Sequence, residues 1–505
     1  MSSVPGVLPG GRRRAPRLLP RIHPALIAIV ALLLALITGR YLANGHVSIG
    51  LAVVLAVCYA PLVLLDLTLA LAVYVAILFI QDTAALSVGP NSVGVLVFLG
   101  WIGTFITRSA RPAVLREQSH LIQVLGVFAL WLALSAIWST DAGATTEALQ
   151  SWLIAVLAFI LTVTTLRGPR DVTVIGIAFI VGAVVSVLFG IGNGGLTAGA
   201  SAEGAQATLD GRFTGGGGDP NVQAAGYLIA MFLCAGFWSL AQQRRHRVAL
   251  LVAFVIVTTG FFATQSRGGL IALAVATVAG LAVLPRQRKR LLGLTAAAGI
   301  GLAIISVVNP GAIERMTDFG GGTSGRNDLW KVAWTIFSQH HWVGIGLNNF
   351  EAVEPHYALS SGTLERVELV AEVPHLVHNL YLQLLTETGV VGFALFLLLI
   401  FGCLRAAWLA ARRFDRLGQR GYADLARAAL MAEIAMLAAQ FFISDGFDWR
   451  LWILLGLGPV LLSIARRTPL PDGAVVSASR GRARASRKRG RRVAQARPFS
   501  ASSFR

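Results

Sequence analysis

Two arginines in this sequence stand where a guanidinium can hold an anion. Arg267 lies in TQSRGGL between two apolar segments, with Gln265 and Ser266 as polar neighbours. Arg326 lies in TSGRNDLW, at the predicted start of a helix, where the guanidinium and the free helix N–H groups together favour an anion. If both arginines lie on the same side of a membrane, they predict a diphosphate site. The simpler alternative for Arg267 is a side chain that only extends its charge to water.

His378 is the candidate general base, because an imidazole titrates near neutral pH. It lies in EVPHLVHNLYLQLL, at the entry to an apolar segment, three residues after His375. Two histidines at that spacing on a helix can share a metal ion. The further ligands available to such a site are Glu351, Glu354 and Glu372. Pro374 places His375 at or before the helix start, so we predict no metal and no cofactor. A capping or interfacial histidine is the simpler alternative.

A glycine run, GRFTGGGGDPN, occupies residues 211 to 221. Consecutive backbone N–H groups can bind an anion, but the run lacks the Lys-Ser/Thr of a phosphate-binding loop. A turn before the next helix is therefore the favoured interpretation. Asp219 and Pro220 are typical of the N-cap and the first residue of that helix.

The elements that must position these residues are membrane helices. The chain of 505 residues is 55% hydrophobic and 13% charged, with a mean hydropathy of +0.69, whereas soluble domains are about a quarter charged. This composition excludes a soluble enzyme. Cys58, Cys234 and Cys403 each lie in a separate apolar run, which excludes a disulfide framework.

Apolar stretches long enough for membrane helices recur along the whole chain. The fourteen segments are 24–43, 47–64, 67–81, 92–107, 120–139, 149–166, 172–192, 222–241, 248–264, 269–284, 291–308, 380–404, 428–444 and 450–465. The third and fourth are short, so twelve remains open. We expect an all-α polytopic membrane protein with about 14 (12 to 14) transmembrane helices.

The net charge of +19 is a topology signal. If the N-terminus is cytoplasmic, most of the 43 Lys and Arg residues fall on the cytoplasmic side, as the positive-inside rule requires. We therefore expect both termini in the cytoplasm and no nucleic-acid partner. The basic tail contains RGRARASRKRGRR; it either contacts anionic membrane lipids or is disordered.

Two segments on the exterior side, 193–221 and 309–377, are long for loops. The second contains Trp330, Trp334, Phe337 and Trp342, and its residues 328 to 338 have helical spacing with an aromatic face. Short helices lying on the outer membrane surface are expected there. His340, His341 and His356 are assigned to these helices and their flanks.

Taken together and in order, these motifs resemble the O-antigen ligases and related bacterial polysaccharide polymerases. His378-Asn379, nine further residues and then Gly389-Val-Val-Gly392 are similar to the family's His-Asn/Ser/Gln and Gly-x-x-Gly pattern. The Ser266-Arg267-Gly268 and Gly325-Arg326 motifs and GIGLNNF (344–350) also resemble it. The resemblance covers about residues 200 to 400.

This resemblance implies a class C type glycosyltransferase of the bacterial cytoplasmic (inner) membrane with an exterior active site. Its donor would be a glycan on polyprenyl diphosphate, usually undecaprenyl diphosphate, and its acceptor a hydroxyl of a glycan, lipid or protein. Arg267 and Arg326 would hold the diphosphate, and His378 would orient or deprotonate the acceptor. Arg212, Asn379, Gly389 and Gly392 are supporting candidates, and Gly215 to Gly218 with Arg212 would form a flap over the donor.

The resulting division of the chain has five parts. They are a basic cytoplasmic N-terminus (1–23), N-terminal transmembrane helices (24–192), the ligase-like core (193–404) with its exterior loop (309–377), C-terminal transmembrane helices (405–465) and a basic disordered cytoplasmic tail (466–505).

Two alternatives to a ligase remain: a repeat-unit polymerase of the same superfamily, and a transporter or flippase of lipid-linked glycans. Transporters tend to carry midplane ionisable groups and internal repeats, whereas the charged residues expected to matter here lie at the outer interface.

Overall fold

The computed structural model describes residues 59–81, 89–106, 112–194, 212–283, 288–309, 311, 326–360 and 376–469, and the regular structure within them is helical. Along the chain the helices are α3 (Leu67–Ile77), α4 (Gly89–Ile106), α5 (Ala113–Glu117), α6 (Ser119–Leu134), the 3-10 turn η1 (Ser135–Ile137), α7 (Ala142–Thr165), α8 (Pro169–Gly194), α9 (Pro220–Trp238), α10 (Arg244–Ala263), α11 (Arg267–Val283), α12 (Arg288–Val308), α14 (Arg326–Gln339), α15 (Phe350–Ser360), α17 (Leu380–Arg416), α18 (Arg420–Ala439) and α19 (Trp449–Arg467).

The expected all-helical membrane architecture is confirmed. Within the described ranges, seven helices are long and apolar enough to cross a membrane, and four shorter helices are also apolar. Each predicted segment from residue 67 onward coincides with a helix, whereas 24–43 and most of 47–64 lie outside the described residues. The number of 12 to 14 spans therefore stays a prediction. Ile106, Val278 and Phe401 are among the large apolar side chains on the outside of the bundle, where lipid would solvate them.

The core of the bundle is formed by α9, α18 and α19. All residues of α19 from Arg450 to Ala465 are buried, as expected of a helix that is apolar on every side. α18 packs against α9, α11, α17 and α19, and it can approach them closely because eight of its positions are alanine. This core fixes the ends of α9 and α19, from which part of the candidate site is built.

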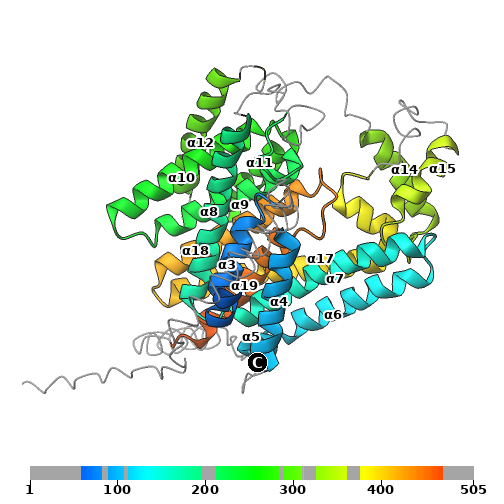
Figure 1. The fold of residues 1–505 in the computed structure, drawn as a ribbon, viewed down its shortest axis with the longest axis horizontal. Coiled ribbons are helices and arrows are strands. Elements are labelled where there is room, and N and C mark those ends of the chain that lie inside the picture. Colours follow the sequence, from blue (N-terminus) through cyan, green and yellow to red (C-terminus); the bar gives the residue numbers. More distant parts are fainter. Residues whose placement is uncertain are drawn as a thin grey trace, which may run out of the picture.

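Figure 1 shows α14 and α15 together at one end of the molecule, beside the beginning of α17, the end of α6 and the beginning of α7. The two helices share a small core of their own, which includes Leu329, Val332, Ile336 and Phe350. The short helices expected in segment 309–377 are thus present. Trp334 and Trp342 remain exposed, with 58% and 65% of their surface accessible, which suits an interface with lipid headgroups.

α17 extends beyond the segment predicted for it. The sequence places the end of the apolar stretch at residue 404, but the helix continues to Arg416. Hydropathy marks only the apolar part, whereas the following alanines, leucines and arginines are strong helix formers and carry the helix on. The boundary expected between residues 404 and 405 therefore falls inside a continuous helix.

Candidate active site

The glycine run leads into a capped helix, as its sequence predicts. The Asp219 carboxylate accepts hydrogen bonds from the backbone N–H groups of Asn221 (2.6 Å) and Val222 (3.0 Å), and Pro220 is the first residue of α9. The cap satisfies two N–H groups that would otherwise have no partner in the first helical turn. The Asp219 side chain thus fixes where α9 begins.

Arg212 connects the glycine run to the turn between α10 and α11. Its Nε donates to the carbonyl oxygen of Thr264 at 2.9 Å, and its Nη2 donates to the Asn221 side-chain oxygen at 3.0 Å. The Ser266 hydroxyl donates to the same oxygen at 2.8 Å. Asn221 therefore holds together two segments that are 40 or more residues apart in the sequence.

Arg267 is the first residue of α11 and is half-buried. The helix start is fixed by Ser266, whose hydroxyl oxygen accepts from the backbone N–H of Gly269 at 3.1 Å. Gly268 allows a close approach, because a Cβ at this position would lie 2.7 Å from the Cβ of Phe442. The motif thus places the Arg267 guanidinium at the end of the bundle from which α14 projects.

Arg326, the first residue of α14, is electrostatically coupled to both Arg267 and Asp219. Burial lowers the pKa of the Arg326 guanidinium, Asp219 raises it and Arg267 lowers it further. Arg267 and Arg326 are 59 residues apart in the sequence, and the fold brings their charges together. Two guanidinium groups that repel one another favour a dianion placed between them.

His378 lies directly before the first turn of α17, half-buried and close to α14. The indole N–H of Trp330 donates to the carbonyl oxygen of Val377 at 3.0 Å, and Trp330 is one helical turn after Arg326. Residues four apart on a helix are neighbours on its surface. The contact therefore brings the backbone next to His378 to the helix that carries Arg326.

Asn379 caps α17, since its side-chain oxygen accepts from the backbone N–H groups of Tyr381 and Leu382, both at 3.1 Å. Its own N–H donates to the Ser444 hydroxyl at 3.1 Å. In the His-Asn motif, the asparagine therefore fixes the backbone and leaves the histidine side chain for other contacts.

Gly389 marks a break in α17, where its φ is 66° and its ψ is −173°. The nine residues between Asn379 and Gly389 form the short helical stretch that precedes the break. A Cβ on Gly389 would collide with the carbonyl group of Trp342, and one on Gly392 would collide with Thr388. Gly389 thus allows close packing against backbone and Gly392 against the Thr388 side chain, which is a supporting function rather than contact with a substrate.

The GIGLNNF segment supplies partners for the backbone groups that the break leaves free. The N–H groups of Ile345 and Gly346 donate to the carbonyl oxygens of Thr386 (3.1 Å) and Glu387 (2.9 Å). The indole N–H of Trp131 donates to the carbonyl oxygen of Thr388 at 2.9 Å. The three carbonyl groups directly before the break, those of Thr386, Glu387 and Thr388, are therefore all paired, which reduces the cost of interrupting the helix.

Three residues other than glycine have positive φ within the described ranges: Gln265 (52°), Asn348 (58°) and His378 (51°). Each lies in one of the motifs that the sequence singles out. Left-handed backbone costs a non-glycine residue about 1 kcal/mol or more and is concentrated at functional sites. Asparagine and histidine adopt this conformation more often than most residues, but the sequence does not indicate at which positions they do so.

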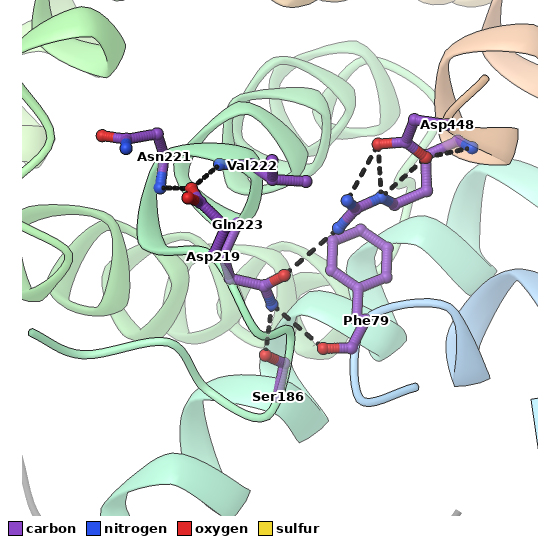
Figure 2. A network of polar contacts seen from close by, with 8 residues as sticks. Phe79, Ser186, Asp219, Asn221, Val222, Gln223 and Asp448 are labelled. Carbon is purple, nitrogen blue, oxygen red and sulfur yellow. Dashed lines mark hydrogen bonds and ion pairs between the residues drawn. The ribbon is translucent and has the colours of Figure 1, made fainter. Parts of the chain in front are cut away.

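Sequence reasoning missed a buried polar network beneath the glycine run (Figure 2). The Arg450 guanidinium pairs with the Asp448 carboxylate at 2.8 Å and donates to the Gln223 side-chain oxygen at 3.1 Å. The Gln223 amide donates to the carbonyl oxygen of Phe79 and to the Ser186 hydroxyl. The sequence did contain a signal for it: Asp448 and Arg450 form a charged pair at the start of a predicted membrane span.

The glycine run rests on this network. Gly215 and Gly217 are buried, and the carbonyl oxygen of Gly215 accepts from the Ser186 hydroxyl at 2.8 Å. This packing differs from the flap that the sequence led us to expect, because a flap needs a backbone that is free to move.

The remaining histidines on this side are peripheral. His340, His341 and His356 are exposed. His340 and His341 directly follow α14, and His356 is in α15, as the sequence assigns them. His375 and Glu372, considered as metal ligands, lie outside the described residues.

In chemical terms, the arrangement offers two clustered guanidinium groups, a carboxylate beside them and an imidazole on a strained backbone. Guanidinium groups bind phosphoryl oxygens in bidentate fashion. An imidazole can accept a proton from a hydroxyl group.

Comparison with known proteins identifies a family domain. Residues 252–397 match the family model described as O-antigen ligase, which confirms the resemblance found from the motifs. The matched region contains Arg267, Arg326, His378, Gly389 and Gly392, whereas Arg212 precedes it. A comparison of the chain with curated proteins found no match.

Proposed function

We propose that this membrane protein, which carries an O-antigen ligase family domain over residues 252–397, transfers a glycan from a polyprenyl diphosphate carrier to an acceptor hydroxyl. The reaction takes place on the exterior face of the bacterial cytoplasmic membrane, with both termini of the chain in the cytoplasm. The donor carrier is undecaprenyl diphosphate or a related polyprenyl diphosphate. No metal and no other cofactor takes part.

The proposal is carried by the electrostatic coupling of Arg326 with Arg267. Two arginines from different helices, one of them with a pKa lowered chiefly by burial, form a local positive charge for which a diphosphate is the natural counter-ion. Neither a neutral sugar nor an acyl chain would need such a pair. His378 directly follows Val377, whose carbonyl oxygen accepts a hydrogen bond from Trp330 on the helix that begins with Arg326.

In the proposed step, the acceptor oxygen attacks the anomeric carbon of the donor glycan. A new carbon–oxygen bond forms, and the bond between the anomeric carbon and the diphosphate oxygen breaks with both electrons leaving on oxygen. Arg267 and Arg326 stabilise the negative charge that grows on the leaving diphosphate. The imidazole of His378 orients the acceptor hydroxyl and takes its proton.

A polymerase would use the same residues, since joining repeat units also releases polyprenyl diphosphate. In that reaction the acceptor is itself a lipid-linked glycan rather than a different glycan, lipid or protein. The two reactions differ only in what binds opposite His378, so an acceptor panel distinguishes them.

A transporter of lipid-linked glycans is the second candidate, and Glu433 is the observation that favours it. Glu433 lies within α18, fully buried, and neither of its carboxylate oxygens has a hydrogen-bond partner among the described residues. The expectation that the important charges lie at the outer interface did not consider this carboxylate. Ionisable groups at such positions are typical of transport pathways.

The deciding experiment follows release of polyprenyl diphosphate from a polyprenyl-diphosphate-linked oligosaccharide, using purified full-length protein in detergent. Wild type and His378→Ala are compared over a panel of glycan, lipid and protein acceptors. Release that requires both an acceptor and His378 is expected, and the acceptor that works identifies ligase or polymerase. Absence of release with every acceptor, together with donor translocation across proteoliposomes that Glu433→Gln abolishes, would establish the transporter instead.

A further inference from the structure

The strongest unexplained feature outside the proposed reaction centre is the buried ion pair between Arg450 and Asp448. Arg450 is 2% exposed, and its Nε lies 3.1 and 3.0 Å from the two Asp448 oxygens. Its guanidinium also lies over the Phe79 ring, 5.4 Å from the centroid. A buried ion pair adds little to stability compared with apolar residues of the same size, because desolvation offsets the attraction. Stability alone therefore does not account for it.

The pair extends to α9 through Gln223. The Arg450 Nη1 donates to the Gln223 side-chain oxygen at 3.1 Å, and the Gln223 amide donates to the carbonyl oxygen of Phe79 at 3.0 Å and to the Ser186 hydroxyl. Gln223 is 0% exposed. Figure 2 shows its side chain directed away from Asn221 and toward Ser186 and Phe79.

Three glycines leave the space that this network occupies. A Cβ on Gly217 would overlap the Gln223 side-chain oxygen, and one on Gly215 would overlap the hydroxyl groups of Tyr227 and Ser186. A Cβ on Gly226 would lie 2.9 Å from Nη1 of Arg450. The glycine run is therefore shaped to fit the network.

The first turn of α9 joins this network to the arginines of the proposed site. Asp219 is electrostatically coupled to Arg326, and Asn221 accepts from Arg212 and Ser266, the residue before Arg267. Gln223 faces Arg450. The contacts of Asn221 and Gln223 thus fix this turn from two directions, and a shift of the turn would move Arg212 and the start of α11 with it.

We propose that Arg450 and Asp448 are positioning residues for the diphosphate-binding arginines, and that they act through Gln223 and the first turn of α9. This inference rests on the proposed function for the identity of the anion. The buried pair holds Gln223 and the glycine run in place, and the turn then holds Asn221 where it orients Arg212 and the start of α11, the helix that begins with Arg267. Preorganised charges bind a dianion better than mobile ones, because less ordering remains to be done on binding.

The test measures binding of inorganic pyrophosphate to the purified full-length protein by calorimetry, a readout that needs no glycosyl transfer. Gln223→Met keeps the ion pair and the side-chain volume but removes the bridge. Gly217→Ala displaces Gln223 by a single methyl group. Arg450→Lys keeps the charge beside Asp448 but lacks the planar fork that reaches Gln223. We expect each variant to weaken pyrophosphate binding by about tenfold or more.

Arg427→Met is the matched control. Arg427, in the first half of α18, forms ion pairs with Asp415 and Asp424 that are less buried than the Arg450 pair, so this variant should lower the melting temperature without changing pyrophosphate affinity. Unchanged affinity in both Gln223→Met and Gly217→Ala would overturn the proposal. The proposal would also be overturned if Gln223→Met and Gly217→Ala lost no more pyrophosphate affinity than Arg427→Met and lost the same amount of thermal stability.

The outcome also separates this inference from the proposed reaction. If the variants lose pyrophosphate affinity but wild type transfers no glycan, the positioning network stands and the glycosyltransferase proposal fails. If wild type transfers glycan and the variants bind pyrophosphate normally, the reaction stands and the positioning network fails. Absence of pyrophosphate binding by wild type contradicts the diphosphate site and the inference together.

Discussion

The indole N–H of Trp330 and the carbonyl oxygen of Val377 lie 3.0 Å apart, and this hydrogen bond joins α14 to the residue before His378. Trp330 is one helical turn after Arg326. One contact therefore relates the proposed donor-binding arginine to the proposed base, although the two are 52 residues apart in the sequence. It also implies that movement of α14 would separate the two parts of the site.

Replacing His378 by asparagine should abolish transfer while preserving the fold. Asparagine tolerates the left-handed backbone (φ 51°) of this position but cannot act as a base at neutral pH. We expect acceptor-dependent release of polyprenyl diphosphate to fall by about 10²-fold or more. His341→Asn, at an exposed histidine nearby, serves as the control and should be fully active. Near-normal release by His378→Asn would exclude the imidazole as base.

Replacing Arg267 or Arg326 by alanine should raise the KM for the lipid-linked donor by about tenfold or more and leave the KM for the acceptor unchanged. The double variant should lose less than the product of the two single effects, because both arginines contact one diphosphate. Steady-state kinetics with each substrate varied in turn measures this. Arg412→Ala provides the comparison, since that guanidinium stacks on Trp408, 4.5 Å from the ring centroid, near the far end of α17. Equal changes in both KM values would contradict donor-specific binding.

Gly389→Ala should destabilise the protein more than Gly418→Ala does. Both glycines have positive φ (66° and 72°), but a Cβ at Gly418 meets nothing within 4 Å, whereas one at Gly389 meets the backbone of Trp342. Gly418→Ala should therefore show only the conformational cost of about 1 kcal/mol. Gly389→Ala should cost at least about 1 kcal/mol more, because backbone cannot move aside easily. Thermal unfolding in one detergent compares them, and equal midpoints would show that the α17 break tolerates a side chain.

Glu354 should make the stability of the α14–α15 region depend on pH. Burial, assisted by the nearby charge of Glu351, raises the pKa of Glu354 to about 7. Since the folded state binds this proton more tightly than the unfolded state, the contribution is fully present below the ordinary pKa of 4.5 and is lost as the pH rises through 7. Glu354→Gln should remove this dependence, while Glu351→Gln should only reduce it. Hydrogen exchange of α15 from pH 4 to 8 measures the effect, and identical profiles for wild type and Glu354→Gln would refute it.

The sequence by itself determined the helical membrane architecture and the identity of the candidate residues. Apolar segments cannot remain in water, so each segment that hydropathy predicted from residue 67 onward coincides with a helix, whereas the short helix α5 was not predicted. Local chemistry also predicted details such as the Asp219 and Pro220 cap, because a cap depends only on neighbours in the sequence. The family pattern around His378 and Gly389 was likewise readable, and residues 252–397 match the O-antigen ligase family.

The tertiary structure alone decided which of these residues meet. The coupling of Arg326 to Arg267 and Asp219 and the bridge from Arg450 to Gln223 join segments separated by 59 to 227 residues. No local pattern encodes such distances, because packing of the whole bundle determines them. The left-handed backbone of His378 and Gln265 was hidden for the same reason. A strained conformation persists only where surrounding contacts hold it, and those contacts come from distant helices.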